Sequence, residues 1–87
     1  MFYYVYILLS LKDRNLYVGK TNDIFKRLER HNNGRVLATK ARRPLKLIHL
    51  EVFSDAGKAF LREREFKYPS AGKFKKELRE RLGIGKD

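Results

Sequence analysis

Three strand-like segments and three helix-like segments predict an α+β fold. Residues 2–9 and 16–20 are rich in aromatic and branched side chains and flank a short polar turn, which is typical of an antiparallel hairpin. The helix-like segments carry apolar residues at four-residue spacing. The chain has 87 residues, enough for one modest core, so we expect a single domain over residues 1–87.

The first strand, residues 2–9, is apolar on both of its faces, and Tyr6 lies on one of them. A strand with two apolar faces is expected at the centre of a sheet. In the second strand, Tyr17 and Gly19 share a face because side chains alternate. Gly19 weakens a strand unless a packed helix, a bulge or a ligand must approach its backbone closely.

A short helix is predicted next, opening at Asp23 and stopping at the Asn-Gly pair that ends with Gly34. Thr21 or Asn22 is the expected cap, and the charge of Asp23 suits the positive end of the helix dipole. Residues 34–44 have few apolar side chains and predict a mobile, exposed connection.

Arg27 and His31 lie four residues apart on this helix, along the edge of a buried stripe that begins at Ile24. Both are expected to be half turned toward the sheet. Arg27 either faces an anionic ligand or pairs with Asp23, four residues earlier. His31 is either a surface or capping residue near a helix end or part of a reaction site.

Residues 45–53 predict the third strand, in which His49 is expected to be structural, and Ser54 is the expected cap of the helix that follows. At about 100° per residue, one side of that helix is mainly apolar. It carries Ala56, Ala59, Phe60, Phe66 and Lys67.

Glu63 falls in the middle of that side, whereas Glu65 lies on the opposite, solvent-facing side. A carboxylate in an apolar stripe needs a partner, because an isolated buried charge is costly. Arg27, Lys67 or a metal ion could supply it. The last helix is amphipathic, ends at Gly83 and could dock a partner. Its apolar stripe consists of Phe74, Leu78 and Leu82.

The chain is strongly basic, with 21 Lys and Arg against 10 Asp and Glu and a formal net charge of +11. Such a field favours a polyanionic partner, and nucleic acid is the leading candidate. A merely solvated surface and an anionic membrane surface are the alternatives. The basic residues expected to contact phosphates are Lys20, Arg35, Lys40, Arg42 and Arg43.

The sequence contains no cysteine, which excludes disulfides and thiolate sites for zinc or iron–sulfur clusters. This composition is compatible with a reducing cytoplasm, where we expect the protein to act. The apolar start is interrupted by Lys12 and Asp13, far short of a membrane span, so neither a secretory segment nor a membrane anchor is expected.

Together these residues resemble the GIY-YIG nuclease domain, specifically its small stand-alone proteins of the URI type. The resemblance is carried by Tyr4-Val5-Tyr6, Tyr17-Val18-Gly19-Lys20, Arg27, His31 and Glu63. It implies one small three-stranded antiparallel β-sheet flanked by helices, with a site for phosphodiester hydrolysis on the sheet surface. Tyr4 replaces the glycine of the first triad, a change common in this subgroup.

The resemblance also implies roles. Tyr6, Tyr17 or His31 helps to deprotonate the attacking water, and Arg27 stabilises the charge that develops on phosphorus. Glu63 binds a single divalent metal ion, Mg²⁺ or Mn²⁺. The expected function is therefore a metal-dependent endonuclease acting on DNA, with strandedness left open. The alternative is a non-catalytic nucleic-acid-binding module of the same fold, acting on structured RNA or on single strands.

Overall fold

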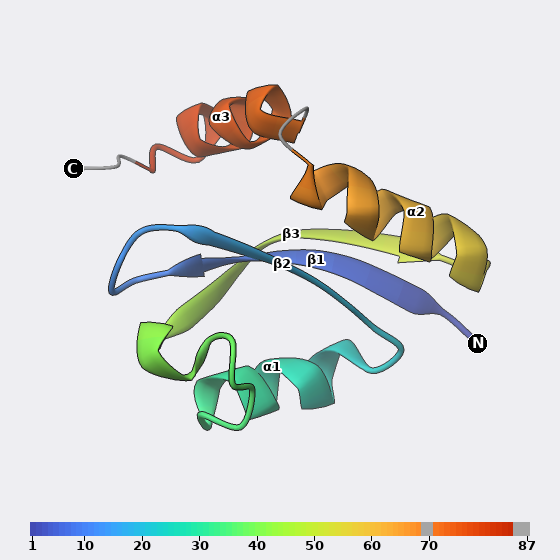
Figure 1. Ribbon diagram of the computed structural model, residues 1–87, viewed down its shortest axis with the longest axis horizontal. Helices are drawn as coiled ribbons and strands as arrows, with labels where there is room; N and C mark the ends of the chain where they lie inside the picture. The colour runs from blue at the N-terminus through green and yellow to red at the C-terminus, as the bar shows by residue number, and fades with distance from the viewer. Residues whose placement is uncertain (69–70, 85–87) are drawn as a thin grey trace.

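The computed structural model describes residues 1–68 and 71–84, and within them the three strands form one antiparallel sheet in the order β2-β1-β3. The elements in chain order are β1 (Tyr3–Ser10), β2 (Leu16–Thr21), α1 (Ile24–Asn32), the 3-10 helix η1 (Lys40–Arg42), β3 (Leu45–Phe53), α2 (Ala56–Lys67) and α3 (Gly72–Arg81). Figure 1 shows α1 on one side of the sheet and α2 and α3 on the other. The predicted α+β architecture is confirmed.

The central strand β1 supports a separate apolar core on each face, as its two apolar faces predicted. Facing α1, the buried side chains are Tyr6, Leu8, Ile24 and Leu45. Facing α2 and α3, they are Val5, Ile7, Val18, Ala59, Phe66 and Leu78. Burial of apolar surface on both faces explains why a strand so poor in polar residues lies between two others.

The predicted caps of the first two α-helices are wrong by one or two residues. Asp23, not Thr21 or Asn22, caps α1, and its carboxylate accepts a hydrogen bond from a first-turn backbone N–H. Thr21 still belongs to β2, and its hydroxyl accepts from the backbone of Asp23. Asp55, not Ser54, caps α2 and accepts from two backbone N–H groups. In both places an ionised carboxylate is the stronger acceptor for these N–H groups.

Most of residues 34–44 are exposed, as predicted, but polar and apolar contacts also anchor the segment to the rest of the fold. Val36 and Thr39 are buried, and the segment includes the short helix η1. The hydroxyl of Ser10 donates to the carbonyl of Arg42 at 2.6 Å, joining this segment to the end of β1. The low apolar content of residues 34–44 did not reveal this anchoring, because polar contacts provide much of it.

On α2, Phe60 is 48% exposed, although the helical projection placed it on the apolar side. Ala59 and Phe66 are the residues that α2 buries. They lie only about 20° apart around the helix axis, whereas Phe60 is about 100° from Ala59. Leu82 follows the last residue of α3 and is also exposed, so the apolar stripe of α3 is shorter than predicted.

His49 is structural, as predicted. Its Nε2 lies 2.8 Å from Glu51, and its ring packs edge-on against Phe66 and Phe74. In the part of the chain that the structure describes, no helix is long and apolar enough to cross a membrane.

Candidate active site

The site begins where β1 and β2 pair. Tyr6 lies directly opposite Gly19, and its ring crosses the backbone of Gly19 so closely that a Cβ there would overlap the phenol hydroxyl. The close approach expected at Gly19 is therefore real, and the approaching group is an aromatic ring rather than a helix or a ligand. Without a side chain at Gly19, the hydroxyl of Tyr6 can extend toward the edge strand β2.

The hydroxyl of Tyr6 joins two residues of α1. It lies 2.8 Å from Nε2 of His31, and its oxygen accepts a hydrogen bond from Nε of Arg27 at 3.4 Å. Tyr6 and His31 are fully buried, so His31 lies deeper than the half-turned position that was predicted. Arg27 is half-buried and points to Tyr6 rather than to Asp23.

The other ring nitrogen of His31, Nδ1, lies 2.8 Å from the hydroxyl of Thr39, which is also fully buried. The Thr39 hydroxyl donates its single proton to the carbonyl of Val36, at 3.4 Å. It must therefore accept from Nδ1–H, which leaves Nε2 of His31 to accept from the Tyr6 hydroxyl. The hydrogen bonds thus select one neutral tautomer of His31.

Thr39 is the residue of this cluster that sequence reasoning missed. It lies eight positions beyond His31 in a segment with no helical or strand periodicity. A threonine in such a segment carries no local signal of a buried contact, because the contact depends on how residues 34–44 fold back over α1.

Burial, followed by the positive charge of Arg27, lowers the pKa of His31 from 6.5 to about 4. Burial also raises the pKa of Tyr6 above its usual value of 10, although Arg27 opposes this effect. At neutral pH, Tyr6 therefore keeps its proton while His31 is an unprotonated base in contact with it. Because the pKa of Tyr6 is raised and that of His31 is lowered, the imidazole can take the proton of the phenol only if the phenol gains another proton at the same time.

Tyr17 also packs against the imidazole, with its ring edge-on to His31 at a centroid distance of 5.3 Å. It is half-buried, whereas Tyr6 is fully buried, so Tyr17 is the more accessible of the two phenols. Tyr6 and, to a smaller extent, Tyr17 raise the pKa of Arg27. The two tyrosines, Arg27 and His31 therefore form one contiguous cluster.

Glu63 comes from α2, on the other face of the sheet (Figure 1). Its charge contributes to raising the pKa of Tyr6, so the carboxylate lies within electrostatic reach of the phenol. The side chain of Glu63 is 17% exposed, and its Oε2 pairs with Lys67 at 3.2 Å. The side chain of Glu65 is 63% exposed, as the helical projection predicted.

These groups fit a lightly coordinated divalent cation. Among residues 1–68 and 71–84, no cluster of three or more His, Cys, Asp or Glu side chains gathers in one place. Mg²⁺ commonly binds through one or two carboxylates and takes its remaining ligands from water and substrate phosphates. Glu63 is a half-buried carboxylate within electrostatic reach of Tyr6, so it meets that requirement, with Lys67 as its present partner.

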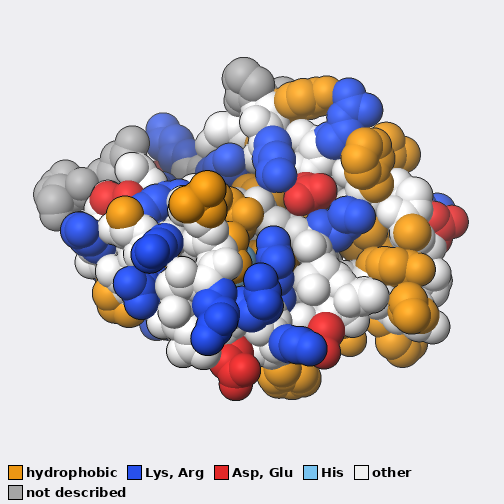
Figure 2. Space-filling model, turned by 60° about the horizontal axis from the view of Figure 1, so that its bottom comes forward, with side chains coloured by type: hydrophobic (Ala, Val, Ile, Leu, Met, Phe, Trp, Pro, Cys, Tyr) orange, Lys and Arg blue, Asp and Glu red, His pale blue; other side chains and the backbone are white. Residues whose placement is uncertain are grey.

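Basic side chains gather over the face that carries α1, as Figure 2 shows. Arg35 and Lys40 are exposed, and Nε of Arg43 donates to the carbonyl of Lys40 at 2.9 Å. Arg42, in contrast, is held 3.0 Å from the carboxylate of Asp13.

Lys20 belongs to β2 and follows Gly19, so alternation places it on the sheet face opposite to Tyr6. The structure therefore does not gather all five predicted basic residues into one patch. Arg35, Lys40 and Arg43 are the members that a ligand bound over α1 would meet.

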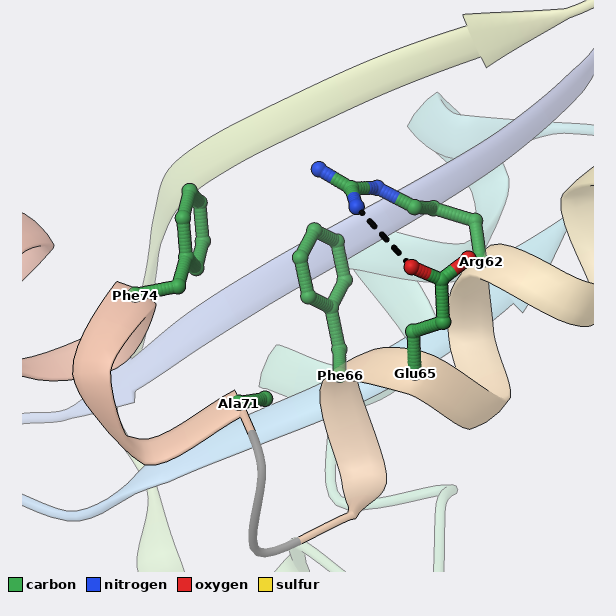
Figure 3. Close-up of a pocket in the computed structure, with 5 residues that line it drawn as sticks. All are labelled: Arg62, Glu65, Phe66, Ala71 and Phe74. Carbon is green, nitrogen blue, oxygen red and sulfur yellow. Dashed lines mark hydrogen bonds and ion pairs between the residues drawn. The ribbon is translucent and has the colours of Figure 1, made fainter.

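A separate hollow of about 190 Å³ lies between α2 and α3 (Figure 3). It is lined by Arg62, Glu65, Phe66, Ala71 and Phe74. The guanidinium of Arg62 lies 4.2 Å from the ring centroid of Phe66 and pairs with both Glu51 and Glu65. These contacts tie α2 to β3, so the hollow is a product of packing on the face opposite to Tyr6.

Comparisons with known proteins find a matching family model and several relatives. The family model described as the GIY-YIG catalytic domain matches residues 2–78. A UPF0213 protein of Syntrophus aciditrophicus is 47% identical over 66 residues, which cover 74% of this chain and 75% of the relative. A UPF0213 protein of Bacillus licheniformis is 40% identical over 86 residues, 98% of this chain and 88% of the relative.

The fold is also similar to a solved structure. The solution NMR structure of a UPF0213 protein from Bacillus halodurans superposes with a TM-score of 0.57 and 33% sequence identity. The match covers 90% of this chain and 83% of that one.

Proposed function

Because the chain belongs to the GIY-YIG catalytic domain family, we propose that it is an endonuclease that hydrolyses phosphodiester bonds in DNA with the help of Mg²⁺ or Mn²⁺. One observation carries the proposal most directly. It is the hydrogen bond between the Tyr6 hydroxyl and the unprotonated Nε2 of His31, with the Arg27 guanidinium beside the phenol oxygen. A phenol, a base and a cation in contact are the groups that activation of water and phosphoryl transfer require.

The proton moves in two coupled transfers. Tyr6 takes a proton from the attacking water while it passes its own proton to Nε2 of His31, so the phenol stays neutral throughout. The water oxygen then forms a bond to phosphorus, and the bond from phosphorus to the leaving oxygen breaks. Tyr17, the more accessible phenol, hydrogen-bonds and orients the water.

Arg27 links this relay to the substrate. In the structure the guanidinium covers the Tyr6 hydroxyl through a long hydrogen bond of 3.4 Å. A substrate phosphate is a stronger acceptor, so it draws the guanidinium away and uncovers the hydroxyl. The phosphate also neutralises the charge of Arg27, which is one of the two causes that lower the pKa of His31. Substrate binding therefore makes His31 a better proton acceptor.

Glu63 is the residue that would hold the divalent metal ion. When bound there, the ion would supply positive charge against the transferring phosphate and the leaving oxygen. The pairing of Glu63 with Lys67, at 3.2 Å, holds the carboxylate in place before substrate binds. Arg35, Lys40 and Arg43 would contact the flanking phosphates over α1, whereas Lys20 would meet phosphate only on the opposite face of the sheet and Arg42 only by leaving Asp13.

The direct test incubates the purified protein with end-labelled single-stranded, duplex and branched DNA, with Mg²⁺, with Mn²⁺ and with EDTA. We expect strand cleavage only with a metal. Glu63→Gln should lower the cleavage rate by about 100-fold or more, because the metal supplies several kcal/mol of transition-state stabilisation. The matched control is Glu65→Gln, which makes the same change on the exposed side of α2 and should leave the rate unchanged.

Two results would contradict this function. Full activity of Glu63→Gln would remove the carboxylate from the mechanism. Salt-dependent DNA binding with no cleavage under any metal would instead support the non-catalytic binding module, which the net charge of +11 also favours.

A further inference from the structure

Three side chains follow one another at four-residue spacing: Phe60 and Arg64 on the solvent side of α2, and Tyr68, the residue that caps its C-terminal end. We refer to them as the aromatic row. Phe60 and Tyr68 are each 48% exposed. The guanidinium of Arg64 lies between them, 5.8 Å from the ring centroid of Phe60 and 5.5 Å from that of Tyr68, and it donates to the Tyr68 hydroxyl.

We propose that the aromatic row is a stacking surface for the bases of an unpaired nucleic-acid strand that passes the active site. This inference rests on the proposed function in one respect: α2 also carries Glu63. It goes further, because it assigns binding residues and the strandedness of the substrate.

The row is separate from the core that α2 buries. Ala59 and Phe66 pack on the sheet, and Phe60 is about 100° around the helix axis from Ala59. Grouped aromatic rings that stay half-exposed mark a binding surface more often than isolated exposed residues do. Along the upper right rim of Figure 2, apolar side chains alternate with basic ones on the side where Figure 1 places α2.

The row adjoins the proposed catalytic site. On the helix, Glu63 lies about 60° from Phe60, between the row and the buried stripe. Phe60 and Tyr68 are eight residues apart, which is about 12 Å along the helix. Stacked bases are separated by about 3.4 Å along a strand, so this length accommodates roughly three nucleotides. A strand with a phosphate at Glu63 can therefore place its neighbouring bases against the row.

Planarity and charge indicate the occupant. Aromatic rings and the planar guanidinium of Arg64 stack on the faces of bases, whereas in a duplex those faces are covered by the adjacent base pairs. The net charge of +11 attracts the phosphates of such a strand without regard to its sequence. An apolar protein partner would need the hydrophobic area of Phe60 but not its flat ring, and this difference can be tested.

The test measures binding by fluorescence anisotropy in EDTA, so that no cleavage occurs. The probes are a labelled single-stranded DNA of mixed sequence and about 12 nucleotides, the matching single-stranded RNA and the matching DNA duplex. Phe60→Leu keeps an apolar side chain but removes the ring, and Phe60→Trp enlarges it. Leu11→Ala is the control, because Leu11 is exposed to a similar extent but lies in the hairpin turn.

We expect Phe60→Leu to weaken binding of a single strand by about tenfold, with duplex binding changed by less than about twofold. Phe60→Trp and Leu11→Ala should bind like the unmodified protein. A tenfold loss on either DNA or RNA single strands supports the proposal. Thermal unfolding of each variant checks that the fold is kept, which is expected because Phe60 is outside the core.

The proposal is overturned if Phe60→Leu binds single strands as tightly as the unmodified protein does, or if single-strand and duplex binding weaken equally. Normal binding by Phe60→Leu together with weakened binding by Phe60→Trp would point to a protein partner and would also overturn the proposal. Because binding is measured without metal, failure to find cleavage would contradict the nuclease activity without affecting this result.

Discussion

The ring of Tyr6 occupies the space that a side chain at Gly19 would need. The two residues are direct partners in the hairpin, and Gly19 is buried beneath the ring. Glycine is therefore required here by packing. The same contact directs the Tyr6 hydroxyl to His31 and Arg27, so the hairpin register and the geometry of the site depend on each other.

Gly19→Ala should displace the Tyr6 ring and lower the free energy of unfolding by about 1 to 3 kcal/mol, as overpacking of a core does. Urea denaturation measures the change. In a Tyr6→Ala background the same substitution should cost less, because the ring it displaces is gone. Gly72→Ala is the matched control: a Cβ there has no heavy atom within 4 Å and should be neutral or slightly stabilising. Equal stabilities for Gly19→Ala and the unmodified protein would refute the packing argument.

Thr39→Val should lower both stability and cleavage rate, whereas Thr39→Ser should leave both close to normal. Valine has the shape of threonine but leaves Nδ1–H of His31 buried without its acceptor, at a cost of about 1 to 3 kcal/mol. Without the Thr39 hydroxyl, no hydrogen bond holds the proton of His31 on Nδ1, so Nε2 is no longer kept free to accept from Tyr6. Urea denaturation and the imidazole nitrogen shifts in NMR spectra measure the two effects. If valine and serine behave alike, the hydroxyl does not control His31.

Stability should fall between pH 6.5 and pH 4 because of His31. Above pH 6.5 the imidazole is neutral in both the folded and the unfolded states. Between these values the unfolded state binds a proton that the folded state, with a pKa of about 4, does not bind. The loss is at most about 3 kcal/mol, from 1.36 kcal/mol for each unit of pKa difference.

Urea denaturation at several pH values measures this dependence. His31→Gln should remove the loss of stability that occurs between pH 6.5 and pH 4. Asp13 and Glu51 also have lowered pKa values, so their contribution is lost at lower pH, below the usual range of a carboxyl group. An unchanged slope in His31→Gln would show that another group is responsible.

Glu51→Gln should destabilise the protein by about 1 kcal/mol without altering the cleavage rate. Glu51 accepts two hydrogen bonds from Arg62, at 2.7 Å and 3.0 Å, and the bond to Arg62 is the main reason that its pKa is lowered. Glu65 contacts the same arginine from an exposed position. Glu65→Gln should therefore change the free energy of unfolding by less than about 0.5 kcal/mol. A marked loss of activity in Glu51→Gln would link this face of α2 to catalysis.

Local sequence patterns were sufficient to predict the hairpin, the central position of β1 and the different environments of Glu63 and Glu65. Strand alternation and helical periodicity are short-range properties, so a few neighbouring residues reveal them. They also placed Tyr6, Arg27 and His31 on elements that could meet. The caps at Asp23 and Asp55 were missed because competing acceptors stand within one or two residues of each other.

The depth of His31, its bond to Thr39 and the exposure of Phe60 were decided only by the tertiary structure. Thr39 reaches His31 because Ser10 anchors residues 34–44 to the end of β1, a contact between residues far apart in the chain. Phe60 stays outside because the sheet admits only a narrow stripe of α2 around Ala59 and Phe66. Contacts of this kind depend on how separate elements pack, and no local pattern encodes that packing.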